Sequence, residues 1–189
     1  MPNLAKQVGT APTCRWEGRL ARIVAIHALF PNGKAANPDY LYTSGKENRF
    51  NLAGTPCLYM SLEESTAVAE FRRQFRGLAI GTHPPECHFF AEVRLHRVLN
   101  VRDPSTLAHL SVTGSELRAD WGYGLPSSVS QRVGEAAAAC GVEAILYESV
   151  AAAESGVEGT NIVVFRQNVQ PASYLRILGP GGTPIAQWP

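Results

Sequence analysis

The residues best suited to chemistry lie in one short stretch, residues 48–60, and in the segment that follows it. Arg49 supplies a permanent cation, and a Gly-Thr-Pro sequence after it predicts a turn. Cys57–Met60 predicts a short strand that carries the aromatic Tyr59, and Glu70 adds one carboxylate on the next segment. These residue types suit an anionic ligand that contains a ring, with a carboxylate placed against it.

The composition is that of an ordinary globular protein. A length of 189 residues predicts one domain, and 45% hydrophobic with 17% charged residues is enough for a core. The net charge of +1 gives no reason to expect binding to nucleic acid or to a membrane. No apolar run reaches the length of a membrane span and no signal peptide is recognisable, so we expect a cytoplasmic protein. The four cysteines form no C-x-x-C pair and are expected to be free and mostly buried.

The first half of the chain is expected to contain two strands and a helix. We predict a loose arm over residues 1–18, a first strand over Arg19–Leu29 and a long loop over Pro31–Asn48. Residues 61–64, Ser-Leu-Glu-Glu, have the form of a capping box and predict a helix that runs to Arg76. Three residues at spacings of three and four form its apolar stripe: Val68, Phe71 and Phe75.

The second half is expected to add strands and one more helix. Apolar and polar residues alternate over Phe89–Leu95, which predicts a half-buried strand, and residues 103–127 are expected to be irregular. Residues 128–131, Ser-Val-Ser-Gln, form a second capping box that predicts a helix through Ala139. The remaining predictions are strands over Ala144–Tyr147, Ile162–Phe165 and Tyr174–Leu178, a loop over Ser149–Thr160, and a flexible tail over residues 179–189.

The expected fold class is α+β. Strands and helices do not alternate strictly, which disfavours a doubly wound parallel sheet. We predict one domain over residues 19–178 with mostly antiparallel strands and flanking helices. The motifs of a Rossmann site, a P-loop, a zinc protease and a nucleophile elbow are absent from the sequence. The five histidines are not spaced as metal ligands, so no metal is predicted; His27 stands out because it lies near Arg22.

Several short segments follow one another in an order that a known family shares. They are Arg22, Asn-Arg-Phe-Asn at 48–51, Leu58-Tyr59, the predicted helix with Glu70, Ser-Gln and Gly at 130–134, and Ser149 with Gly-Thr-Asn-Ile-Val-Val-Phe at 159–165. In this order the chain resembles the RES-domain family, bacterial toxins named for a recurring Arg, Glu and Ser. The resemblance covers about residues 19–167.

Three positions depart from the pattern of that family. Asn48 stands where Gly is usual, and Phe50 replaces the more common Trp. Glu148 stands where Pro commonly precedes the serine, and it adds a carboxylate beside Ser149.

The resemblance implies a fold similar to ADP-ribosyltransferase toxins, with a split sheet around a cleft for NAD⁺. It implies NAD⁺ as a substrate rather than a prosthetic group, and an Xre-like antitoxin protein as partner. Our main hypothesis is a toxin that cleaves the nicotinamide–ribose bond by hydrolysis or phosphorolysis and so depletes NAD⁺. The alternatives are an ADP-ribosyltransferase that modifies a cellular protein, and a non-catalytic nucleotide-binding module. Water, inorganic phosphate and a protein side chain remain open as acceptors.

The implied reaction suits Glu70 and the two arginines. The nicotinamide of NAD⁺ is already cationic, so it leaves without a general acid, and one carboxylate suffices where ordinary glycoside hydrolysis uses two. Glu70 would stabilise the oxocarbenium-like ribose, bond a ribose hydroxyl or orient the nucleophile; without the resemblance it would be assigned as a solvated helix residue. Arg22 and Arg49 suit the pyrophosphate because a guanidinium pairs with two phosphate oxygens, and internal salt bridges are the alternative.

The other candidate residues each have two interpretations. Tyr59, which we place with Glu70 and Arg49 among the catalytic residues, would stack on the nicotinamide or ribose, or pack in the core. Asn51 would contact the ligand, or build the turn. Ser149 would bond ribose or phosphate, or end a strand. The same reasoning predicts a structural role for Asn161.

Overall fold

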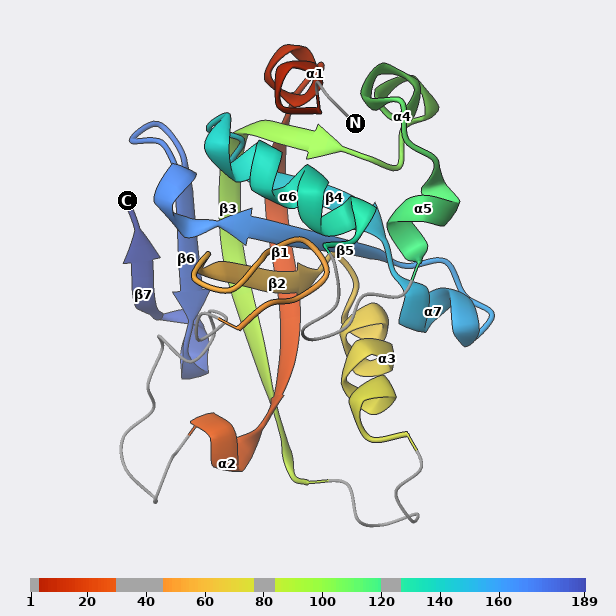
Figure 1. Ribbon diagram of the computed structural model, residues 1–189. Coiled ribbons are helices and arrows are strands. Elements are labelled where there is room, and N and C mark those ends of the chain that lie inside the picture. The colour runs from red at the N-terminus through yellow and green to blue at the C-terminus, as the bar shows by residue number, and fades with distance from the viewer. Residues whose placement is uncertain (1–3, 30–45, 77–83, 120–126) are drawn as a thin grey trace.

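The structure is a computed structural model that describes residues 4–29, 46–76, 84–119 and 127–189. Within these residues, one seven-stranded sheet forms the centre and helices cover its faces (Figure 1). The elements in chain order are α1 Leu4–Thr10, β1 Cys14–Ala25, α2 Ile26–Leu29, β2 Cys57–Ser61, α3 Glu64–Gln74, β3 Glu86–Asn100, α4 Pro104–Leu110, α5 Gly114–Arg118, α6 Val129–Ala139, β4 Ala144–Glu148, α7 Val150–Glu154, β5 Thr160–Phe165, η3 Arg166–Asn168, β6 Tyr174–Leu178, η4 Pro180–Gly182 and β7 Pro184–Trp188.

The sheet closes on itself. β1 pairs with β2 and also with β3, so the ring runs β1, β2, β5, β4, β3 and back to β1, while β6 and β7 extend from β3. β3 and β4 run parallel, and the other neighbours are antiparallel. The expected combination of helices and a sheet is confirmed. The expected split, mostly antiparallel sheet is corrected to a mixed, closed one, because β1 has 12 residues and reaches two partners.

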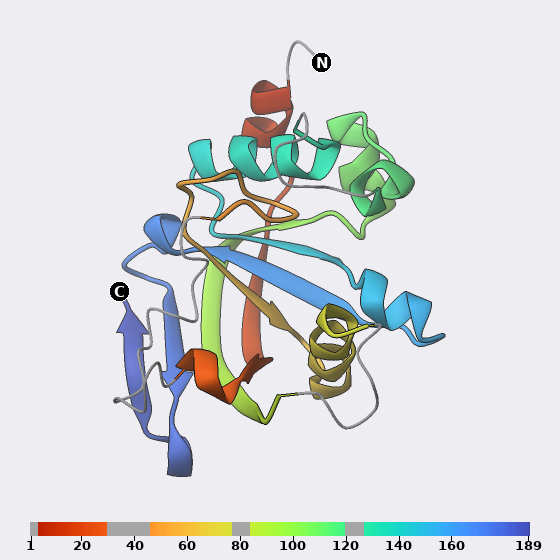
Figure 2. The ribbon, with the colours of Figure 1, turned by 60° about the horizontal axis from the view of Figure 1, so that its bottom comes forward.

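Apolar residues gather in separate clusters on the two sides of the strands. In one cluster the buried members are all strand residues, such as Ala91, Val93 and Leu95 of β3, and they come from β1 to β6. A second lies between the sheet and α6, with α1, α4 and α5 around it (Figures 1 and 2). A small third cluster places Phe71 of α3 against β1. The predicted alternation over Phe89–Leu95 is confirmed by this arrangement.

Both ends of the chain are more ordered than the sequence predicted. Residues 1–18 are not simply a loose arm, since α1 packs on α6 through buried Leu4 and Val8, and β1 already begins at Cys14. The chain leaves the strand conformation after Ala25 rather than continuing to Leu29. The tail over 179–189 also differs, because β7 pairs with β6. The domain limits themselves stay a prediction.

The helix predictions succeeded at one capping box and failed at the other. Ser128 and Gln131 cap α6 reciprocally, as expected. The predicted box at residues 61–64 is wrong, because Ser61 belongs to β2 and its hydroxyl donates to Asn161 Oδ1 at 2.7 Å. α3 begins only at Glu64. The stretches predicted as irregular contain three further helices among the described residues: α4, α5 and α7.

Two further expectations can be compared with the structure. No described helix is both long and apolar enough to cross a membrane. The four cysteines are free thiols, but only Cys57 is buried, and Cys14 is exposed. Most of the loop predicted over Pro31–Asn48 lies outside the described residues.

Candidate active site

A cleft of about 750 Å³ lies where β1, β2 and α3 meet. The two strands are joined there by the single residue pair Ala21 and Ser61. Four arginines and one carboxylate are the charged residues of its described lining: Arg22, Arg49, Arg73, Arg76 and Glu70. The described lining therefore carries an excess of positive charge, which Glu154 offsets in part through Arg73 and Arg76.

Glu70 of α3 is held in this cleft by two donors. The Ser149 hydroxyl donates to Glu70 Oε1 at 2.8 Å, and the Asn161 amide donates to the same oxygen at 2.5 Å. Ser149 is 1% exposed and Asn161 4% exposed, so neither donor is free to turn away. Within the described part of the chain, both hydrogen bonds end on Oε1, which leaves Oε2 for a ligand.

Ser149 orients Glu70 rather than lining the cleft. Its Oγ accepts a hydrogen bond from the Ala152 N–H at 3.0 Å and so caps α7 at its N-terminus. Asn161, which we predicted to be structural, has a larger part because its amide lines the cleft and touches Glu70. The side-chain oxygen of Asn161, Oδ1, accepts a hydrogen bond from the Ser61 hydroxyl. A contact between Ser149 and ribose or phosphate stays a prediction.

Arg49 is a nearly buried cation with an exposed fraction of 8%. Its Nη1 donates to two backbone carbonyls at the end of α5, Leu117 at 2.9 Å and Ala119 at 3.3 Å. Among the described residues, no carboxylate forms an ion pair with it. The described partners of Arg49 are thus neutral carbonyls, and its binding of an anionic ligand stays a prediction.

Arg22 lines the cleft from β1. Its Nη1 donates to the Tyr59 carbonyl at 3.0 Å, close to the place where the pairing of β1 with β2 ends. The guanidinium thereby connects the two strands and also lines the cleft. His27 lies beyond it on α2 and is not part of the described lining.

Tyr59 and Asn51 together build the turn that presents Arg49. The Tyr59 hydroxyl donates to Asn51 Oδ1 at 2.8 Å and accepts from the Phe50 N–H at 2.9 Å. Asn51 has no exposed surface, and its amide donates to backbone carbonyls on both sides of the turn. Burial raises the pKa of Tyr59 well above its usual value, which keeps the phenol neutral. Asn51 therefore serves the turn, and Tyr59 both supports the turn and belongs to the lining of the cleft.

Helix α6 presses on the same turn from behind. A Cβ on Gly134 would lie 1.8 Å from the Phe50 carbonyl oxygen, so only glycine permits this approach. The same helix also supplies Glu135, whose Oε1 accepts from the Leu52 N–H at 3.3 Å and from the Thr55 hydroxyl at 3.2 Å. The segment at 130–134 thus contributes to the site by holding the turn in place.

The unusual Glu148 does not enter the main cleft. Its carboxylate pairs with Arg118 at the end of α5, and half of its side chain, 52%, is exposed. Because α5 also carries the carbonyls that anchor Arg49, this ion pair connects the supports of Arg49 and Ser149. The carboxylate of Glu148 therefore forms an ion pair outside the main cleft.

The sequence did not single out several residues of the cleft. Arg73 and Gln74 line it from the last turn of α3, and Arg76 lines it from the turn that follows the helix. The spacing of three from Glu70 to Arg73 would have placed both on one face of the helix. Tyr147 of β4 also lines the cleft, and its pKa is raised by burial and by the nearby Glu70 carboxylate.

Comparisons with known proteins agree with this arrangement. The family model for the RES domain matches residues 19–185. The chain belongs to the RES-domain family. The fold is similar to a chain in the crystal structure of the M. tuberculosis MbcT–MbcA toxin–antitoxin complex, with a TM-score of 0.63 and 17% identity over 90% of this chain and 87% of that one. No curated protein matches the sequence.

The family match confirms the resemblance that the sequence indicated, and it extends past residue 167 into β7. At 17% identity, the likeness to the chain of the M. tuberculosis toxin–antitoxin complex concerns the fold alone. The residues that the resemblance singled out lie together in the structure: Arg22, Arg49 and Glu70 line the cleft, and Ser149 donates to Glu70.

Proposed function

We propose that this RES-domain protein is the toxin of a toxin–antitoxin pair and that it cleaves the nicotinamide–ribose bond of NAD⁺. The observation that carries the proposal is the carboxylate of Glu70, fixed on one oxygen by Ser149 and Asn161 in a cleft lined by arginines. Membership in the family and a fold like that of the M. tuberculosis toxin support the toxin role.

The proposed chemistry needs little from the protein beyond placement and charge. The bond between C1′ of the ribose and the nicotinamide nitrogen breaks, and its electron pair neutralises the ring, so nicotinamide leaves without a proton. Positive charge then develops on the ribose, where Oε2 of Glu70 would stabilise it in a partly dehydrated cleft. An oxygen of water or phosphate bonds to C1′, and the proton that it loses passes to Glu70 or to solvent.

The two arginines of the family pattern would hold the pyrophosphate. Arg49 is the stronger candidate, because it is nearly buried and its described partners are neutral carbonyls. Arg22 would act from β1. Holding the pyrophosphate with both guanidinium groups would fix the ribose against Glu70 before the bond breaks.

We further propose an Xre-like antitoxin as the partner, which would block the cleft. The support is that the solved relative with the same fold was crystallised as a toxin–antitoxin complex. Growth of cells that express this protein alone should stop, and the variant Glu70→Gln should restore it.

The direct experiment measures NAD⁺ consumption by purified protein, with products identified by mass and with phosphate present or absent. Wild type should release nicotinamide with ADP-ribose or its 1″-phosphate, and Glu70→Gln should be slower by about 10²–10³-fold. Glu64→Gln is the matched control, since it removes a carboxylate from the same helix outside the cleft lining. Transfer of labelled ADP-ribose from NAD⁺ to a protein of a cell extract would indicate the transferase instead. No nicotinamide release, with purified protein or in the extract, would contradict the proposal.

A further inference from the structure

We propose that Arg73 and Arg76 form a second anion subsite of the cleft, which binds a phosphate group separate from the pyrophosphate. The inference rests on the proposed function only in assigning NAD⁺ to the first subsite, at Arg22 and Arg49. The ligand of the second subsite is a phosphate dianion, either inorganic phosphate or a phosphate monoester carried by the dinucleotide.

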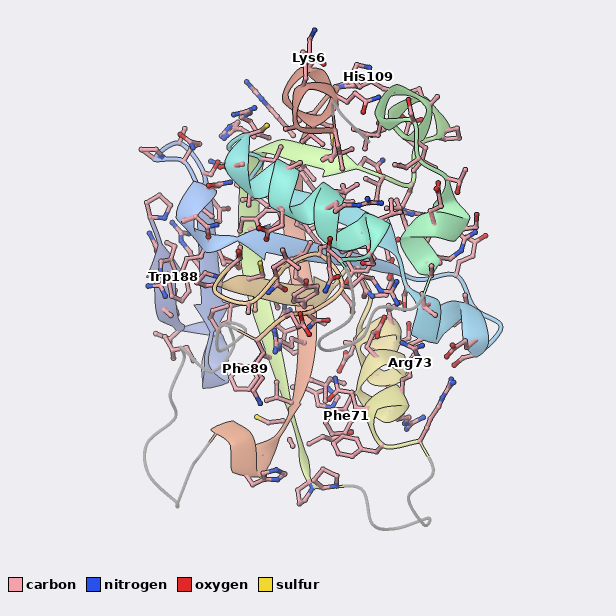
Figure 3. All side chains as sticks on the ribbon, in the orientation of Figure 1. Lys6, Phe71, Arg73, Phe89, His109 and Trp188 are labelled. Carbon is pink, nitrogen blue, oxygen red and sulfur yellow. The ribbon has the colours of Figure 1, made fainter. Side chains whose placement is uncertain are left out.

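The placement of the two arginines at the end of α3 and just beyond it is the first argument. Glu70 and Arg73 are three residues apart on α3, which places them on one face of the helix. Arg76 follows three residues later in the turn after the helix, and all three residues line the cleft. Arg73 lies on the side of α3 near α7, whereas Phe71 points to the strands (Figure 3). Arg72, the neighbour on the same helix, is exposed and is not part of the lining.

The second argument is the charge of this cluster. Glu154 at the end of α7 accepts from Arg73 Nε at 3.1 Å and Nη2 at 3.3 Å, and it pairs with Arg76 Nη1 at 2.7 Å. Two guanidinium groups thus share one carboxylate, which leaves one positive charge uncompensated within the cluster. The pair is open to water, since Arg76 is 57% and Glu154 35% exposed, so a ligand can displace this carboxylate.

The third argument is the geometry that Glu154 imposes. Its two oxygens accept N–H groups from both arginines. A phosphate dianion has more oxygens and more charge than a carboxylate, so it would bind the same N–H groups more strongly. Glu154 therefore acts as a resident competitor for the subsite. The same short helix ends in Glu154 and is capped by Ser149, so α7 connects the second subsite with Glu70.

The phosphate has two possible sources. Inorganic phosphate would be the acceptor: its oxygen bonds to C1′ as the bond to nicotinamide breaks, the electron pair goes to nicotinamide, and ADP-ribose 1″-phosphate forms. A phosphate monoester would be part of the substrate, as in NADP⁺, and the subsite would then select the phosphorylated dinucleotide. Both sources need the same two guanidinium groups.

The test measures binding of inorganic phosphate to the full-length protein by calorimetry, without turnover. Wild type should bind phosphate, Arg73→Gln should weaken binding about tenfold or more, and Glu154→Gln should strengthen it several-fold. Arg72→Gln is the matched control, because it removes the same charge from the same helix outside the cleft. If Arg73→Gln fails to melt cooperatively, Arg76→Gln takes its place. A loss in Arg72→Gln as large as in Arg73→Gln would overturn the proposal.

A second arm distinguishes the two sources. NAD⁺ and NADP⁺ are titrated into Glu70→Gln, with and without phosphate. If NADP⁺ binds more tightly than NAD⁺, and the difference disappears in the double variant Glu70→Gln with Arg73→Gln, the subsite binds the phosphate monoester. If NAD⁺ and inorganic phosphate bind at the same time, the subsite binds the acceptor. If neither NADP⁺ preference nor phosphate binding is found, even in Glu154→Gln, the subsite does not exist. Because both arms measure binding, they remain decisive whether or not the protein cleaves NAD⁺.

Discussion

Glu143 and Glu70 are two carboxylates bonded to the same sheet, and they differ in how their oxygens are used. Glu143, just before β4, has no exposed surface; its Oε2 accepts the N–H of His96 at 2.6 Å and of Arg97 at 2.8 Å, and its Oε1 accepts the N–H of Gln170 at 2.8 Å. Glu70 receives its two described hydrogen bonds on Oε1 alone. Where both oxygens are bonded, the carboxylate serves the fold; where one is left, it can serve a ligand.

The charge of Glu143 is maintained by these donors. Burial by itself would raise its pKa, but the N–H groups of Gln170, Arg97 and His96 and the hydroxyl of Ser173 lower the pKa below the ordinary value. Glu143 therefore stays ionised inside the protein and ties β3 to the segment before β6. The same residue type thus performs two tasks, which substitution to the neutral isostere Gln can separate.

The largest expected effect is on turnover. Glu70→Gln should lose about 10²–10³-fold in NAD⁺ cleavage, whereas Glu143→Gln should keep the wild-type rate per folded molecule, because its side chain lies outside the cleft. Both variants are assayed below the melting temperature of Glu143→Gln. Equal losses in the two variants would remove the distinction between them.

The next effect is on stability, with the order of the variants reversed. Glu143→Gln should lower the free energy of unfolding at pH 7 by about 1–3 kcal/mol, since its amide cannot accept all three N–H groups, while Glu70→Gln should change it little. A lowered folded-state pKa stabilises above the unfolded pKa of about 4.3, and that contribution fades as the pH falls through the folded value. Urea unfolding at neutral and acidic pH should show the gap closing in acid; a constant gap would contradict the assignment.

The smallest effect separates capping from orientation. Ser149→Ala removes an N-cap, worth about 1 kcal/mol, and also one of the two donors to Glu70, so turnover should fall about tenfold. Ser128→Ala is the control, because it removes the N-cap of α6 without touching Glu70. Melting temperatures and NAD⁺ cleavage rates are compared for both. If Ser128→Ala slowed cleavage as much, the contact from Ser149 to Glu70 would have no special role.

Local signals predicted the parts of the fold that depend on neighbouring residues. The reciprocal cap at Ser128 and the alternation along β3 were predicted correctly because each is complete within a few positions. The box at residues 61–64 failed because a strand pairing overrode it, as Ser61 continues β2 and bonds to Asn161. The short helices α4, α5 and α7 were missed because their few residues show no periodic stripe.

The candidate site was predictable in its residue types and less so in its connections. The resemblance identified Glu70 and the arginines, and the family match bears out the resemblance itself. The contact between Asn161 and Glu70 joins positions 91 apart and has no local signature. The sequence did not single out Arg73 and Arg76, and only the position of α7 shows that they meet Glu154.

The single pair that joins β1 to β2 has a consequence for how the ring moves. Every other neighbour in the ring is held by a longer ladder, so the seam between Ala21 and Ser61 is where the closed sheet is easiest to part. Arg22 already bridges this seam through the Tyr59 carbonyl. A ligand that binds both Arg22 on β1 and Glu70 beyond β2 would hold the two strands together. Backbone amides of β1 and β2 next to this seam should then exchange more slowly with solvent when the ligand is bound.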